Sequence, residues 1–164
     1  MIDRLNARVG EAVAWLALGL VLTQFSLVIA RYVFAFGHPA LSEAVWYQHG
    51  LLFTLAAGYT ALRDENVRID LIYGRASLRT RAWIDLCGCL FFVLPLCVLT
   101  IWLSSSYILN AWAVLEGSAE NSGLPLVFAL KTAIWGFAAL LGLAAVSTII
   151  KNWLVLSGRN MAQA

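Results

Sequence analysis

Five ionisable side chains lie inside or at the edges of long apolar segments, where charge is costly: Arg31, Glu43, His49, Asp85 and Lys131. A lone charge at the centre of a bilayer costs about 2.5–3.5 kcal/mol. Such groups serve as binding sites for a transported solute or ion, as proton-coupling carboxylates, or, for histidine, as axial ligands of haem. They also form structural ion pairs inside a helix bundle or at a subunit contact.

The depth of these residues favours structural roles. Arg31 lies about 7–8 Å before the end of its segment and Lys131 about 9 Å after the start of its own. Arg31 and Glu43 flank one short turn, so pairing them is the most economical arrangement. Lys131 would then pair with Glu116, with Glu120 or with a second subunit. Alternatively, the charged ends of Arg31 and Lys131 extend to the membrane surface and need no partner. Solute binding is less favoured, because four short helices leave little room for a cavity.

The two histidines do not form a haem site in this pattern. His49 lies within an apolar segment, whereas His38 lies in a turn beside Pro39. A bis-histidine haem site needs both ligands at one depth. We therefore expect His49 to form a hydrogen bond to a neighbouring helix and expect no cofactor.

The composition is that of an integral membrane protein. Of 164 residues, 62% are hydrophobic and only 12% are charged. In a soluble domain about a quarter of the residues are charged. The net charge of +2 gives no basic surface for nucleic acid. Cys87, Cys89 and Cys97 have neither redox-pair nor zinc spacing, so we expect them to be small buried apolar residues.

Four apolar segments predict an all-α protein with four transmembrane helices in one bundle and a single membrane domain over 1–164. The first segment is longer than a signal-peptide core, so it is expected to be a retained helix. Ser42 is the expected N-cap of the second, and the third is long enough to require a tilt, a kink at Pro95 or a projection beyond the membrane. The expected spans are 9–36, 42–62, 80–115 and 125–156, with a polar loop over 63–81.

The distribution of basic residues predicts the orientation. The N-terminus, the 63–81 loop and the C-terminus hold nine of the eleven lysines and arginines, and the two short connections near residues 37–41 and 116–124 hold none. Basic loops stay on the cytoplasmic side. Both termini are therefore expected to be cytoplasmic, and the two short connections to face outside.

The second segment also carries a stripe of small and polar residues at three- and four-residue steps, which predicts a helix-packing surface because small residues let backbones approach. Near its cytoplasmic end the third segment places Asp85 four residues after Arg81, the spacing of a surface ion pair. The stripe consists of Tyr47, Gly50, Thr54, Ala57 and Ala61.

Taken together, these features resemble the small membrane subunit, DctQ-like, of tripartite ATP-independent periplasmic (TRAP) transporters. The resemblance covers nearly the whole chain. It rests on Arg31-Tyr32 at the end of the first helix, the acidic and aromatic run SEAVWYQHG, the helix ending in RDENVRID with a basic patch to Arg81, and the turn EGSAENSGLP.

The resemblance implies a non-catalytic subunit in the bacterial inner membrane. Its partners would be membrane lipids, the large TRAP membrane subunit, which carries solute with sodium by an elevator motion, and a periplasmic binding protein that delivers a carboxylate-bearing solute. The implied contacts with the large subunit are Arg31, Glu43, Trp46, His49 and Lys131, and those with the binding protein are His38, Glu116, Glu120 and Asn121. Two alternatives stay open: a membrane anchor of a redox enzyme that binds haem or quinone near His49, and a small self-assembling exporter with a proton-coupled Glu43.

Overall fold

The computed structural model describes residues 2–63, 73–74 and 76–158 of the chain. Within these ranges the regular elements are all helical, as the sequence predicts. Most of the predicted 63–81 loop lies outside the described residues. The helices are α1 (Ile2–Val33), α2 (Pro39–Arg63), α4 (Leu78–Gly88), the π-helical turn η1 (Cys89–Val93), α5 (Leu94–Ala113) and α6 (Val127–Leu156).

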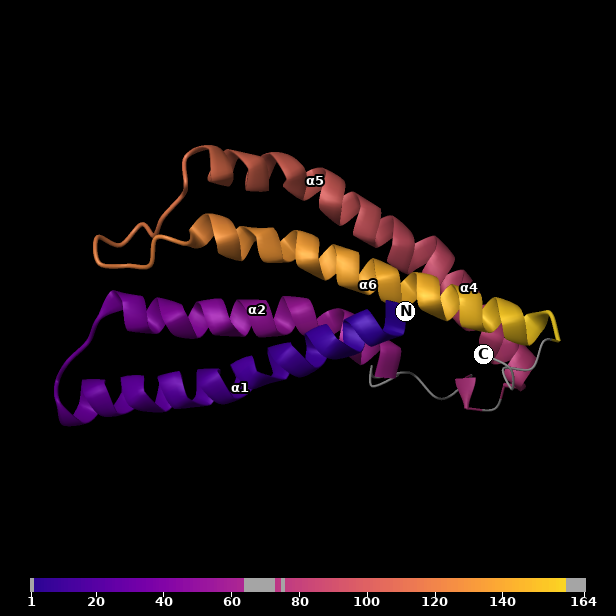
Figure 1. Cartoon of the computed structure of the whole chain (residues 1–164), viewed down its shortest axis with the longest axis horizontal. Helices are drawn as coiled ribbons and strands as arrows, with labels where there is room; N and C mark the ends of the chain where they lie inside the picture. Colours follow the sequence, from indigo (N-terminus) through magenta and orange to yellow (C-terminus); the bar gives the residue numbers. More distant parts are fainter. Residues whose placement is uncertain (1, 64–72, 75, 159–164) are drawn as a thin grey trace.

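The long helices form two antiparallel hairpins that lie side by side. Figure 1 shows α1 running beside α2 and α5 running beside α6, and α2 and α6 form the contact between the hairpins. The connections α1–α2 and α5–α6 lie at the same end of the molecule, which we call the hairpin end (Figure 1). The two short connections that hold no lysine or arginine therefore share one end of the bundle.

Three helical stretches are long and apolar enough to cross a membrane: Ile2–Val33, Leu78–Ala113 and Val127–Leu156. Their most apolar windows have mean hydropathies of 2.1, 2.5 and 2.1. The described helix α2 does not meet the same criterion, so its crossing stays a prediction. Since α2 packs against α1 on one side and α6 on the other, less of its surface needs to be apolar for contact with lipid.

The start of α2 differs from the prediction. The helix begins at Pro39, and the Nδ1 atom of His38 accepts a hydrogen bond of 3.3 Å from the backbone N–H of Ala40. Proline suits the first helical position because its missing N–H would have no partner there. Ser42 is thus already inside the first turn, and its prediction as the N-cap is wrong.

The third apolar segment is one continuous helical run from α4 through η1 to α5. The expected irregularity near Pro95 is present as the π-helical turn that immediately precedes Leu94 and Pro95. A proline ring clashes with the carbonyl four residues earlier, and a π-turn is one way to widen the backbone there. Pro95 therefore changes the winding of a helix that is longer than one membrane crossing requires.

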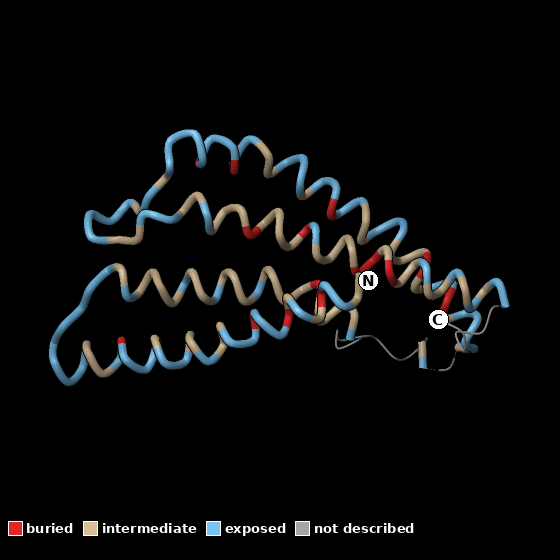
Figure 2. Tube along the Cα trace, viewed as in Figure 1, coloured by how far each residue is buried: buried red, intermediate tan, exposed pale blue. Residues whose placement is uncertain are grey.

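Small residues on α6 form the centre of the packing. The buried residues of this helix are Ala133, Ala138, Ala144, Ala145 and Ser147. Figure 2 shows buried positions on the inward sides of the helices and exposed positions along the outer sides. In the absence of a hydrophobic driving force inside lipid, close contact between small residues is what holds helices together.

One contact shows how closely the helices approach. A Cβ atom built on Gly58 of α2 would lie 2.8 Å from the carbonyl carbon and oxygen of Leu140 on α6 and 2.8 Å from Oδ1 of Asn6 on α1. Three helices thus meet at one glycine. Because two of these atoms belong to the backbone, no side-chain rotation can make room for a larger residue.

We predict that Gly58→Ala destabilises the purified protein by about 1–3 kcal/mol, the usual cost of forcing an extra carbon into a packed core. Gly88→Ala is the matched control, because a Cβ there meets nothing within 4 Å. Thermal unfolding in one detergent, followed by circular dichroism, compares the two. Equal melting temperatures for both variants would contradict this packing.

Candidate functional site

Glu43 ties α2 to the connection between α5 and α6. Its carboxylate accepts a hydrogen bond from the Ser118 hydroxyl and another, of 2.6 Å, from the backbone N–H of Leu124. The connection closes on itself through a bond of 3.1 Å from the Ser118 N–H to the Leu124 carbonyl. A Cβ built on Gly123 would lie 2.6 Å from Oε1 of Glu43, so this turn has room only for glycine. The connection is therefore folded around the carboxylate.

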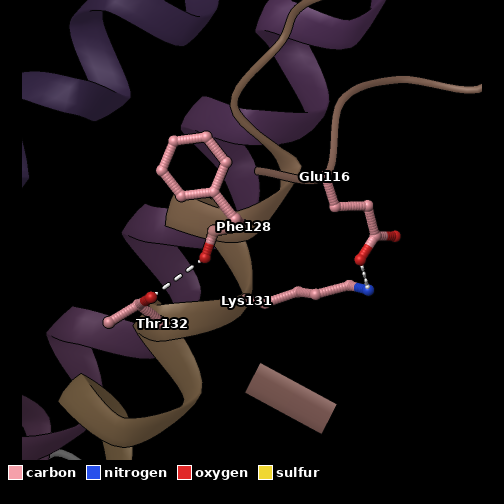
Figure 3. A network of polar contacts seen from close by, with 4 residues as sticks. All are labelled: Glu116, Phe128, Lys131 and Thr132. Atoms are coloured by element: carbon pink, nitrogen blue, oxygen red, sulfur yellow. Dashed lines mark hydrogen bonds and ion pairs between the residues drawn. The ribbon is translucent and has the colours of Figure 1, made fainter. Parts of the chain in front are cut away.

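Lys131 is engaged in the same region. Its ammonium lies 2.5 Å from Oε2 of Glu116 and 3.9 Å from the ring centroid of Tyr107, and the lysine side chain is only 12% exposed. Figure 3 shows Lys131 extending from α6 toward Glu116 on the connection. The charge is compensated by a carboxylate and an aromatic face within the chain. Glu116 is thus the partner, out of the three alternatives that the sequence leaves open for Lys131.

The end of α5 determines where Glu116 lies. Leu115 has φ of 48°, and the N–H of Glu116 donates to the carbonyl of Ala111 over 2.9 Å. This is a Schellman termination, in which one left-handed residue reverses the chain and satisfies the last carbonyls of the helix. The reversal directs the Glu116 side chain toward α6.

A tryptophan joins α5 to α6 beside the ion pair. The indole N–H of Trp112 donates to the hydroxyl of Thr132 over 2.8 Å, and the Trp112 ring packs edge-on against Phe128 at 4.6 Å. Thr132 in turn donates to the carbonyl of Phe128 over 2.9 Å, as Figure 3 shows. The indole N–H therefore has a partner on α6, and the bond fastens the end of α5 to the start of α6.

The structure does not contain the expected ion pair between Arg31 and Glu43. Glu43 has Ser118 and Leu124 as partners, and Arg31 is exposed. Within the described residues Arg31 has neither an ion pair nor a side-chain hydrogen bond. The sequence places both residues beside one turn, but it does not reveal that a distant connection supplies the donors for the carboxylate.

The remaining residues predicted to contact a large subunit lie on α2. Trp46 and His49 are both exposed. The residues of the predicted stripe do not share one environment. Gly50 faces Leu130 of α6, 3.2 Å from a built Cβ, while Thr54 donates within its own helix and Tyr47 is partly buried. Ala57 and Ala61 border two separate hollows.

The residues predicted to contact a binding protein all lie at the hairpin end. His38 stacks on Phe36 at 6.3 Å, and Glu120 and Asn121 are exposed. Glu116 is engaged with Lys131. The exposed members of this set are therefore His38, Glu120 and Asn121.

At the other end of the bundle a second polar cluster was missed by the sequence analysis. Asp3 of α1 forms an ion pair of 2.6 Å with Lys151 of α6 and accepts a hydrogen bond from Ser147. Asn6, which is 1% exposed, donates to the Leu140 carbonyl over 3.4 Å. The spacing of Asp3, Asn6 and Gly10 on one helical face was the available signal.

The predicted pair of Arg81 and Asp85 has other partners in the structure. Arg81 donates to the carbonyls of Gly74 and Ala76, and Asp85 accepts a hydrogen bond of 2.8 Å from the hydroxyl of Tyr73. The three cysteines are free thiols, and Cys97 is buried. No group of three or more histidine, cysteine or carboxylate side chains suited to a metal occurs in the part of the chain that the structure describes.

Comparison with known protein families gives a match. Residues 20–155 match the family described as tripartite ATP-independent periplasmic transporters, DctQ component. This range begins within α1, covers α2 to α5 and nearly all of α6, and includes the Glu43 contacts and the Lys131–Glu116 pair. No curated protein and no solved structure matches the chain.

We predict a coupling of about 0.5–3 kcal/mol between Lys131 and Glu116, because removing one partner of this partly buried pair leaves the charge of the other uncompensated. Lys131→Ala and Glu116→Ala should each destabilise the protein, and the double variant should lose less than the sum. The free energy of unfolding of the two single variants and the double variant is measured in nanodiscs. Strictly additive losses would show that the pair contributes nothing.

We also predict that Glu43→Ala loosens the α5–α6 connection, because the N–H of Leu124 and the hydroxyl of Ser118 lose their acceptor. Amide exchange over residues 118–124 should accelerate by about tenfold, the equivalent of one hydrogen bond of roughly 1.4 kcal/mol. Glu120→Ala on the same connection is the control and should leave exchange unchanged. Equal exchange in the two variants would argue against the role of Glu43.

Proposed function

The chain belongs to the DctQ family, the small membrane component of tripartite ATP-independent periplasmic (TRAP) transporters, and we propose that it acts as a non-catalytic scaffold. In this proposal a large membrane subunit carries a carboxylate-bearing solute with sodium by an elevator motion. The small subunit extends the static surface against which that carrier moves. Solute and sodium are bound by the large subunit and not by this chain.

The observation that supports a scaffold is that Glu43 and Lys131 both bind partners within this chain. Both side chains are engaged by the connection between α5 and α6, through Ser118 and Leu124 for Glu43 and through Glu116 for Lys131. A proton-coupled exporter needs a carboxylate that is free to change its protonation and its partners during transport. Glu43 is instead the acceptor around which a turn is built.

The same reasoning disfavours a redox anchor. The chain has two histidines, His38 and His49. His38 accepts from the N–H of Ala40 in the α1–α2 turn, whereas His49 lies on the exposed side of α2. A bis-histidine haem site requires two ligands on opposite sides of one iron.

For the topology we propose four membrane crossings in the bacterial inner membrane, with α2 as the fourth. The termini and the 63–81 loop face the cytoplasm, and the hairpin end faces the periplasm, as the distribution of basic residues predicts. The exposed residues His38, Glu120 and Asn121 then form a surface for the periplasmic binding protein. The ion pair of Glu116 with Lys131 holds this surface in place.

Reconstitution tests the proposed function. We predict that liposomes containing only this chain do not accumulate labelled carboxylates under a sodium gradient, because in this proposal the large subunit binds solute and sodium. Liposomes with the large TRAP subunit, the binding protein and this chain should accumulate the solute of that system. Uptake by this chain alone would overturn the proposal.

A spectrum tests the alternative of a redox anchor. We predict no Soret band and no extractable quinone in protein purified from its native membrane, because His49 has no second histidine as partner. A stoichiometric haem band that disappears in His49→Leu would support the anchor instead.

A further inference from the structure

A hollow opens between three helices at the end of the bundle opposite the hairpin end. Its volume is about 450 Å³, and it lies between the last turns of α2, the continuous run of α4 and η1, and the second half of α6. Pockets of roughly 300–1,000 Å³ hold small organic molecules. The hollow is separate from the Glu43 and Lys131 contacts, which lie at the hairpin end.

The hollow is elongated along the helices. Its lining extends from Leu141 to Thr148 on α6 and from Ile84 to Val93 on the run of α4 and η1, which is about 10–14 Å at the rise of an α-helix. Ala144 is 1% exposed and lies at the bottom of the hollow, whereas Phe92 is 75% exposed and lies at its edge. The hollow is therefore a long depression, parallel to the helix axes and open to the surroundings of the bundle.

Two backbone features widen the hollow. Gly88 contributes no side chain, and a Cβ built there meets no atom of the described residues within 4 Å. The π-helical turn η1 begins at the next residue, and Cys89, Phe92 and Val93 of this turn line the hollow. Such turns inside α-helices are frequent at functional sites. The space is thus a product of the backbone course and not of one small side chain.

The lining indicates what the hollow can hold. Its polar side chains, Asp85 and Thr148, lie toward one end, and the deeper part is lined by apolar side chains and glycine. Thr148 donates to the carbonyl of Ala144 over 3.0 Å, and Asp85 accepts from the hydroxyl of Tyr73 over 2.8 Å. A buried water needs two to four polar partners. Hydrocarbon therefore suits the deeper part of the hollow better than water does.

A guanidinium lies at the polar end of the hollow. Arg81 precedes Asp85 by four residues and Gly88 by seven, so it lies on the same face of α4 as these lining residues. Its side chain donates to the carbonyls of Ala76 and Gly74 over 3.0 and 2.8 Å. These bonds use two of the five N–H donors of a guanidinium, which can therefore also donate to a phosphate.

We propose that this hollow is a phospholipid site, which holds one acyl chain of a lipid in the cytoplasmic leaflet while Arg81 binds its phosphate. The acyl chains of a bilayer run across it, as the hollow does between membrane-spanning helices. Basic pockets between helices on the cytoplasmic side bind lipid headgroups. The proposal goes beyond the scaffold function and does not depend on it, since only the choice of leaflet comes from the proposed topology.

A lipid titration of the purified chain tests the proposal. Phosphatidylglycerol is added to the full chain in detergent, and native mass spectrometry counts the bound lipids. We expect one tightly bound lipid, and binding about tenfold weaker for Gly88→Phe, because the ring displaces about two methylenes of the acyl chain. Gly37→Phe is the matched control and should leave binding unchanged, because a Cβ at Gly37 also meets nothing within 4 Å.

The phosphate contact has its own measurement. Arg81→Gln should weaken the binding of phosphatidylglycerol by about tenfold, the effect of losing a charge-assisted hydrogen bond. It should not weaken the binding of a diacylglycerol, which has the same acyl chains and no phosphate. Arg31→Gln at the hairpin end should change neither affinity. Equal losses for both lipids in Arg81→Gln would show that Arg81 supports only the fold and does not bind the phosphate.

Photocrosslinking in native membranes identifies the occupant of the hollow. A benzophenone amino acid at position 88 should form adducts with phospholipid. Adducts there with protein alone, whether another subunit, a second copy or another segment of this chain, would overturn the proposal. Unchanged lipid binding by Gly88→Phe would overturn it as well. These results leave the scaffold function intact, whereas a chain that never co-purifies with a large TRAP subunit would contradict that function and leave the lipid site intact.

Discussion

Polar groups inside a bilayer must find their hydrogen-bonding partners within protein, because the hydrocarbon offers none. In this chain the constraint is met at the hairpin end by Glu43, whose carboxylate accepts from Ser118 and from the backbone of Leu124. These bonds join α2 to the connection between α5 and α6, and the same connection supplies Glu116 to Lys131. Two helical hairpins that are far apart in sequence are thereby fastened at one end, and Asp3 and Lys151 join α1 to α6 near the other.

Between these two polar clusters the bundle depends on small residues. Ala138 and Ala144 of α6 are almost completely buried, and Gly58 of α2 meets the backbone of Leu140. Contacts of this kind align helices without introducing polar groups. The polar clusters then determine which helices pair, and the small residues determine how closely they approach. A bundle built in this way is suited to being a rigid support, which agrees with the role that we propose for a DctQ subunit.

Hydropathy and turn residues were sufficient to predict the helical architecture. Local chemistry accounts for the errors at boundaries: the ring of His38 caps α2, so the helix begins at Pro39 and Ser42 is not its N-cap. The ion pair of Lys131 was predictable as one of three alternatives, because Glu116 begins the adjacent connection. The partners of Glu43 were not predictable, because one of them is a backbone N–H, which leaves no trace in residue type. His49 was expected to form a hydrogen bond to a neighbouring helix, but it has no such bond within the described residues.

The unusual charges of the sequence thus fall into two groups. Glu43 and Lys131 have partners within the fold, whereas Arg31 and His49 have none among the described residues. The central proposal is that this chain functions only as part of a larger membrane assembly. Native mass spectrometry of the tagged chain, released gently from its own membrane, tests the claim most directly. The account predicts a complex that contains the 18.0 kDa chain together with a large TRAP membrane subunit. Assemblies made only of copies of the 18.0 kDa chain would contradict it.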